Sequence, residues 1–163
     1  GTNIVNNHFR NNLILSNRSQ MPAMNIATYT NYTTSDYNGF RAGRAAPALI
    51  MWRSPARGVM RDYESEFAPG EFADLDAYAA ATGNDRNSIL VDYDDFRNVE
   101  LPDETTPQRV LPGDDLDFRL RRNSAAIDAG VVLPGVNDGF RGDAPDLGAL
   151  ESGDDPPIYG PRP

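Results

Sequence analysis

The chain has 163 residues, of which 39% are apolar, and a formal net charge of −9. This length is sufficient for one domain with a hydrophobic core. The absence of cysteine excludes disulfides and thiolate metal sites, and no apolar run approaches the ~20 residues of a membrane-spanning helix.

The charges are unevenly distributed along the chain. Residues 1–61 carry seven arginines and one acid, Asp36, a net charge of +6. Residues 62–163 carry eight arginines and 23 acids, a net charge of −15, and the chain has no lysine. A basic first third is suited to an anionic glycan or an acidic partner. The alternative is that it docks against the acidic remainder of its own chain.

Residues 3–15, NIVNNHFRNNLIL, place apolar residues between pairs of asparagines. Asparagine tolerates left-handed backbone angles and bonds its own main chain, so these pairs predict bends between short strands. Asparagines at successive bends are expected to stack into amide ladders. Stacked segments of this kind bury their apolar faces only against neighbours on both sides. We therefore expect upstream segments of the same gene product, or another subunit, to cover this end.

Two further strand signals follow. Residues 26–32 alternate apolar or aromatic residues with Thr and Asn, which is typical of a strand, and Asn38-Gly39 predicts a turn. Residues 48–52, ALIMW, predict a short buried strand. Trp52, the only tryptophan, is expected in the core, and the alternative is an exposed ring that stacks on a sugar.

One segment has the pattern of a helix. Residues 70–83, GEFADLDAYAAATG, place apolar and aromatic side chains on one face, and Gly83 is suited to end the helix. Residues 89–91 then predict a strand.

The last third is acidic and rich in turn residues. Residues 118–120 predict a strand. The segment 123–151 contains two Asp-x-Gly turns, and it predicts short strands near 125–127 and 146–150 joined by an ordered loop. Residues 152–163 are proline-rich and predict an extended tail.

The run SAAIDAG…NDGFRGDAPDLGALE resembles the C-terminal closing segment of right-handed parallel β-helix proteins of the pectate-lyase-like superfamily. Residues 72–92 are similar to the helix and strand that precede the last coil in that family. The resemblance implies an all-β fold, a right-handed parallel β-helix solenoid with one packed helix. It divides the chain into terminal coils (1–69), packing helix and strand (70–92), acidic loop and closing segment (93–151) and tail (152–163).

The resemblance also implies a function. The chain is expected to be the C-terminal portion of a secreted or cell-surface protein, extracellular or periplasmic, that binds or cleaves an acidic polysaccharide. If that protein is an enzyme, it is a polysaccharide lyase or glycoside hydrolase whose catalytic site lies mostly outside this chain, and the sequence assigns no catalytic residue. Because arginine pairs with carboxylates and tryptophan stacks on sugars, the candidate substrate-binding residues are Arg10, Arg41, Arg44 and Trp52.

A second function fits the same sequence. In this alternative the chain is a non-catalytic structural subunit of an envelope or extracellular assembly, docked through its N-terminal end. Its partner is another protein chain. No nucleic-acid-binding pattern occurs in the sequence.

Acidic clusters are candidates for a Ca²⁺ site, because Ca²⁺ prefers oxygen ligands. The metal-ligand candidates are Asp92 and Asp94 in one cluster and Asp138 and Asp143 in the closing loop. None of these clusters matches the twelve-residue EF-hand pattern, and solvated acidic loops are the alternative. His8, the only histidine, has no nearby companion and is expected to be an ordinary packed or surface residue rather than a catalytic one.

Overall fold

The computed structural model describes residues 6–55, 59–62, 70–106 and 109–155. Within them the strands are short: β1 (His8–Arg10), β2 (Leu13–Leu15), β3 (Met24–Ala27), β4 (Thr34–Asp36), β5 (Gly39–Arg41), β6 (Ile50–Arg53), β7 (Glu71–Phe72), β8 (Ile89–Leu90), β9 (Phe96–Asn98) and β10 (Asp117–Leu120). A helix, α1 (Leu75–Thr82), and two 3₁₀ turns, η1 (Tyr93–Asp95) and η2 (Gly113–Asp115), join them. The fold is largely β, as the sequence predicts.

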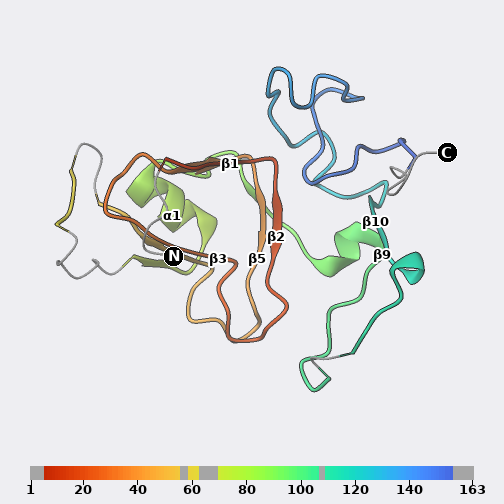
Figure 1. Cartoon of the computed structure of the whole chain (residues 1–163), viewed down its shortest axis with the longest axis horizontal. Coiled ribbons are helices and arrows are strands. Elements are labelled where there is room, and N and C mark those ends of the chain that lie inside the picture. The colour runs from red at the N-terminus through yellow and green to blue at the C-terminus, as the bar shows by residue number, and fades with distance from the viewer. Residues whose placement is uncertain (1–5, 56–58, 63–69, 107–108, 156–163) are drawn as a thin grey trace.

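The first six strands form two stacked sets of three. β1, β2 and β3 pair in parallel with β4, β5 and β6 respectively, and each partner lies 26 residues further along the chain. Figure 1 shows the two sets following the same path around a shared interior. Positive φ angles at Asn6 (55°) and Asn11 (56°) bend the chain beside β1, which confirms the prediction of asparagine bends.

The predicted right-handed parallel β-helix is wrong, because the stacking stops after these two sets. Only β8 adds a third parallel strand, on β5, whereas β7 pairs antiparallel with β6. β9 and β10 form a separate antiparallel pair, so the described strands are divided among four small sheets rather than a solenoid. The physical reason lies in residues 99–155, whose prolines, glycines and acids supply few of the apolar side chains and free N–H groups that a further set requires.

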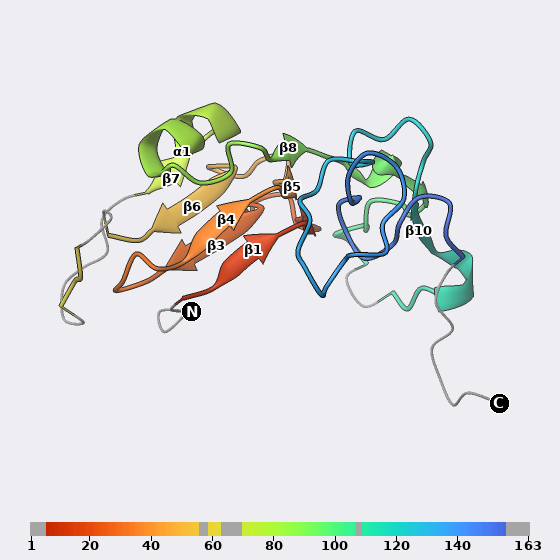
Figure 2. The ribbon, with the colours of Figure 1, turned by 90° about the horizontal axis from the view of Figure 1, so that it is seen from above.

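Two hydrophobic clusters hold the chain together. The first lies inside the strand stack, and its fully buried members include Phe40, Ile50 and Tyr78. The second lies between the stack and the C-terminal half, around Val91, Phe96, Leu120, Ala126 and Leu147. Figure 2 shows the two parts side by side, with α1 and β1 on opposite sides of the stack.

The predicted helix is confirmed in a shorter form. The Asp74 side chain accepts a hydrogen bond from the Ala77 N–H at the start of α1, and Gly83 ends the helix with a φ of 77°. Tyr78 is fully buried, and its ring packs against Trp52 and Phe72 at centroid distances of 5.8 and 5.3 Å. The helix has eight residues, and no helix in the described ranges has the length and apolarity needed to cross a membrane.

The closing segment forms turns instead of the strands predicted near 125–127 and 146–150. The Asp128 carboxylate accepts hydrogen bonds from the N–H groups of Asp143 and Ala144. The Asp146 carboxylate accepts bonds from the N–H groups of Asp128 and Ser152. Local carboxylates and turn hydrogen bonds to nearby carbonyls thus take up backbone groups of this segment that a strand ladder would use.

Candidate functional site

The most distinctive surface of the fold is the free edge of the first strand set. β1, β2 and β3 are each the outermost strand of their own sheet. We call this surface the open edge, defined by residues 8–10, 13–15 and 24–27. Because the constant offset places all three strands on the same side of the second set, the three free edges face in the same direction.

Backbone polarity along β1 can be assigned from its neighbours. The Asn7 carbonyl accepts a hydrogen bond from the Thr34 N–H, and the Asn11 N–H donates to the Tyr37 carbonyl. Backbone groups alternate in direction along a strand. The N–H groups of His8 and Arg10 therefore point away from β4, toward the open edge.

The closing segment hydrogen-bonds beside the open edge at one corner, and its apolar residues pack against Leu13 and Leu15 of β2. The Gly148 N–H donates to the Asn11 carbonyl, and the Asn11 side chain exchanges two hydrogen bonds with the backbone of Val131. These contacts fasten the C-terminal half beside the bend between β1 and β2. Glycine is needed at position 130 beside these contacts, because the Cβ of any other residue would lie only 2.7 Å from the Pro145 carbonyl oxygen.

A buried polar network crosses the stack below this bend. The Asn12 amide donates to the Asn38 side-chain oxygen, and the Asn38 amide donates to Asp85 Oδ1, each at 3.0–3.1 Å. Asn38 is fully buried and Asp85 is 2% exposed. This ladder was expected from the asparagines, whereas its acidic member was not.

Asp85 is the most perturbed carboxylate of this network. Burial raises its pKa, and hydrogen bonds from Ser88, Ser35 and Asn38 oppose that rise only in part. Its Oδ2 atom and the Tyr78 hydroxyl find no hydrogen-bond partner among the described residues. Burial and then the Asp85 charge also raise the pKa of Tyr78. Asn12 at one end of the network is exposed, whereas Asn38 and Asp85 are closed to solvent inside the stack.

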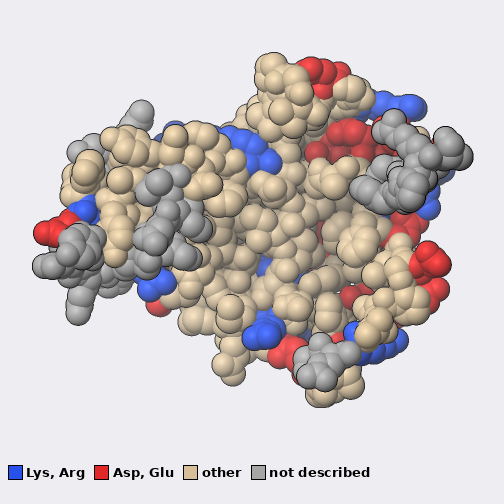
Figure 3. All heavy atoms as spheres, in the orientation of Figure 1, with Lys and Arg blue, Asp and Glu red and all other residues tan. Residues whose placement is uncertain are grey.

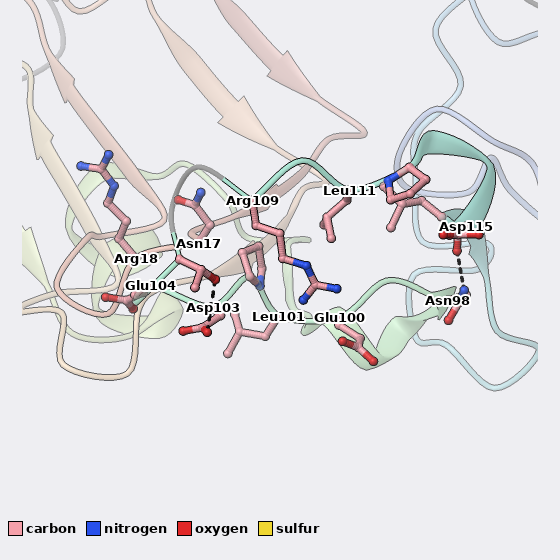
Figure 4. Close-up of a pocket in the computed structure, with 14 residues that line it drawn as sticks. Asn17, Arg18, Asn98, Glu100, Leu101, Asp103, Glu104, Arg109, Leu111 and Asp115 are labelled. Atoms are coloured by element: carbon pink, nitrogen blue, oxygen red, sulfur yellow. Dashed lines mark hydrogen bonds between the residues drawn. The ribbon is translucent and has the colours of Figure 1, made fainter.

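A groove runs between the turn at residues 17–19 and the acidic loop at 98–116. It comprises a cavity of about 570 Å³ and a neighbouring one of about 320 Å³, which share residues 101–104. Figure 4 shows Arg109 reaching into the larger cavity and Arg18 pointing away from its centre. The walls carry four arginines and four carboxylates: Arg18, Arg41, Arg44 and Arg109 against Glu100, Asp103, Glu104 and Asp115. The groove therefore has no surplus of positive charge.

The four predicted substrate-binding residues do not form one site. Arg41 is 8% exposed, lies over the Tyr93 ring and donates to the Asp92 carboxylate at 2.7 Å and to the Ser16 carbonyl. Trp52 is 6% exposed and packs in the first cluster, so its ring is not a platform for sugars. Arg44 is exposed beside the groove. Arg10 of β1 donates hydrogen bonds to the Phe9 carbonyl and to the Thr34 hydroxyl of β4. It is not among the residues that line the groove.

Two of the four predicted metal ligands have hydrogen-bond or ion-pair partners within the chain. Asp92 caps η1 and pairs with Arg41, and Asp138 accepts a bond from the Gly135 N–H. Asp94 and Asp143 are exposed. Across the described part of the chain, no three histidine or acidic side chains gather as a metal site requires.

His8 makes a local contact on the strand stack, and one ion pair links the basic and acidic parts of the chain. His8 is exposed, and its Nδ1 lies 2.8 Å from the Thr34 hydroxyl. The Arg41–Asp92 pair joins the basic first third to the acidic remainder, as the self-docking alternative predicts. The 26-residue spacing of Asn12 and Asn38 is the sequence signal for the stacking, but with only two sets it is too brief to detect as a repeat.

Comparison of the chain with protein-family models, curated proteins and solved structures finds no match. The family resemblance of the closing segment stays a prediction.

Proposed function

We propose that the chain is a docking module that joins another protein through the open edge. The observation that carries the proposal is that β1, β2 and β3 are all outermost strands and all face the same way. A free edge presents N–H and C=O groups at the spacing of an extended polypeptide, ~3.3 Å per residue, and strand addition is its usual mode of recognition.

The two ends of the strand stack differ in how they are covered. On the far side, β8 pairs with β5, β7 pairs with β6, and the Asp85 N–H donates to the Ser35 carbonyl of β4. Helix α1 also lies on that side (Figure 2). On the near side, the closing segment meets the strands at Asn11 only among the described hydrogen bonds. Exposed edges promote aggregation unless they are covered, so the asymmetry favours a partner at the open edge.

The side chains near the open edge support a protein partner. Phe9, Ile14 and Ala23 pack on the first cluster but are only partly buried, and Met21 is 47% exposed. Figure 3 shows mostly uncharged atoms over the strand stack, whereas acidic atoms gather over the C-terminal half. A partly exposed apolar surface beside unpaired strands is typical of a protein interaction site.

The charge of the first set indicates which partner fits. Residues 6–28 contain Arg10 and Arg18 and no acid. A second copy docked head to head places these arginines against their own kind, which disfavours association. A different protein that offers an extended segment with acidic side chains complements the open edge.

Site-specific photo-crosslinking tests this proposal in the cells that produce the protein. The crosslinker is placed at the exposed Asn25 of β3, and in the control at the exposed Asp76 of α1 on the opposite side. We expect an adduct with a different protein from Asn25 alone, through an acidic peptide. His8→Pro removes an edge N–H and reduces the adduct about tenfold, whereas His8→Ala keeps that N–H and retains the adduct.

Three results contradict the proposal. Equal adducts from Asn25 and Asp76 indicate non-specific contact, and an adduct with a second copy replaces the acidic partner by self-association. The absence of any adduct from Asn25 in these cells also overturns it. Circular dichroism of both His8 variants checks that the fold is intact.

Binding of an acidic polysaccharide, and an extracellular or cell-surface location, stay predictions. The groove beside Arg44 is the remaining place for a glycan, although its carboxylates equal its arginines in number. Glycan-array binding that is lost in Arg44→Ala supports this function, and the absence of binding to any uronate-containing glycan counts against it.

A further inference from the structure

A large cavity lies between the strand stack and the C-terminal half. Its volume is about 960 Å³, which is at the upper end of the ~300–1,000 Å³ typical of small-ligand sites. β2 contributes Leu13 and Leu15 to one wall, and Leu116 and Phe118 beside and within β10 contribute to another. Leu150 of the closing segment lines it as well. Three segments distant in sequence thus build one cavity.

The walls of this cavity are suited to an apolar ligand. Leu13, Leu15, Leu116 and Leu150 are only partly buried, and Phe118 is 51% exposed although its ring packs edge-on against Phe96. Aromatic and aliphatic side chains that remain accessible inside a concave surface favour an apolar body that displaces water.

The charges at the cavity are of one sign. Among the described residues, the charged side chains that line it are Asp114 and Asp117, and no arginine or histidine does so. Asp117 is held by Arg119, whose hydrogen bond lowers its pKa to about 2, so it is ionised at neutral pH. Asp114 is exposed, and its carboxylate has no ion-pair partner within the described ranges.

We infer that this cavity binds a small cationic amphiphile, a molecule with an aromatic or aliphatic body and an ammonium head. The apolar walls accept the body. The Asp114 carboxylate attracts the head, and the exposed Phe118 ring offers an aromatic face to a cation. An anionic head meets only carboxylates, so fatty acids and acidic sugars are disfavoured. The inference does not rest on the proposed function, although Leu13 and Leu15 of β2 belong both to the open edge and to the cavity wall.

Isothermal titration calorimetry of the full chain at pH 7 tests the inference with three matched probes. These are 4-phenylbutylamine, 4-phenylbutan-1-ol and 4-phenylbutanoate, which share one body and differ in head-group charge. We expect the amine to bind about tenfold more tightly than the carboxylate, with the alcohol between them, as attraction to an exposed carboxylate replaces repulsion. Methyl NMR shifts of Leu13 and Leu116 on addition of the amine locate the site.

Two variants and a control complete the experiment. Asp114→Asn is expected to weaken the amine about threefold and leave the alcohol unchanged. Leu116→Gln is expected to weaken all three probes, provided that circular dichroism shows the native fold. Asp76→Asn on α1 removes the same charge far from the cavity and is expected to change nothing. Binding of none of the probes, equal binding of all three, or equal effects of Asp114→Asn and Asp76→Asn overturn the inference.

Discussion

Replacement of Asp85 by asparagine is expected to stabilise the protein at neutral pH. The carboxylate is 2% exposed, and its Oδ1 accepts hydrogen bonds from the Ser88 hydroxyl at 2.5 Å and the Asn38 amide at 3.1 Å. Its Oδ2 has no partner among the described residues. Asparagine keeps the Oδ1 acceptor and removes the buried charge. It also tolerates the positive φ of 48° at this position.

The sign of the pH dependence follows from the raised pKa of Asp85. In the unfolded chain an aspartate titrates near ~3.9. Because the folded protein holds the proton more tightly, the contribution of Asp85 to the free energy of unfolding is largest below this pH. It is lost as the pH rises through the folded pKa. Asparagine carries no titrating proton, so the advantage of Asp85→Asn grows with pH and then levels off.

The magnitude is that of removing an incompletely compensated buried charge while a polar atom stays in place, about 1–3 kcal/mol. Urea unfolding at pH values from 4 to 8 measures the difference in the free energy of unfolding between the two proteins. Asp94→Asn, at an exposed carboxylate, is the matched control and is expected to change stability by less than about 0.5 kcal/mol. A variant that is less stable than the native protein at pH 7, or a difference that is constant with pH, refutes the reasoning.

Two further substitutions test the packing of the strand stack. Phe40→Ala empties a fully buried site in β5, and we expect it to lower the free energy of unfolding in urea by about 3–5 kcal/mol. The control, Leu90→Ala in the adjacent β8, changes a side chain that is 64% exposed and is expected to cost less than about 1 kcal/mol. Equal costs for the two variants contradict the assigned core. Gly43→Ala places a Cβ against the carbonyl oxygens of Arg18 and Ser19. We expect this overpacking to cost about 1–3 kcal/mol and to lower the thermal midpoint of unfolding by several degrees. An unchanged midpoint contradicts this close approach of the two backbone segments.

Local features of the fold were within reach of the sequence because they depend on neighbours in the chain. Helix α1 ends at Gly83, as the sequence predicts, but it begins only after its Asp74 cap, because Glu71–Phe72 at the start of the predicted helix form β7 instead. The bend at Asn11 and the carboxylate turn at Asp128 likewise follow from side chains that bond nearby backbone. Residues 125–127 form turns instead of a strand, because the N–H groups of Ala126 and Ile127 bond the hydroxyl and the carbonyl of nearby Ser124 in place of a ladder.

Only the tertiary structure shows which elements contact one another, because the type of an apolar or charged residue does not specify the residue it will pack against or pair with. Trp52 lies against Tyr78, and Arg41 binds Asp92, 51 residues away. The solenoid was extrapolated from local coil patterns, whereas the chain stacks two strand sets and then turns to α1. The composition of the first set predicts that its end is covered, and the arrangement of β1, β2 and β3 as outermost strands shows where that end lies.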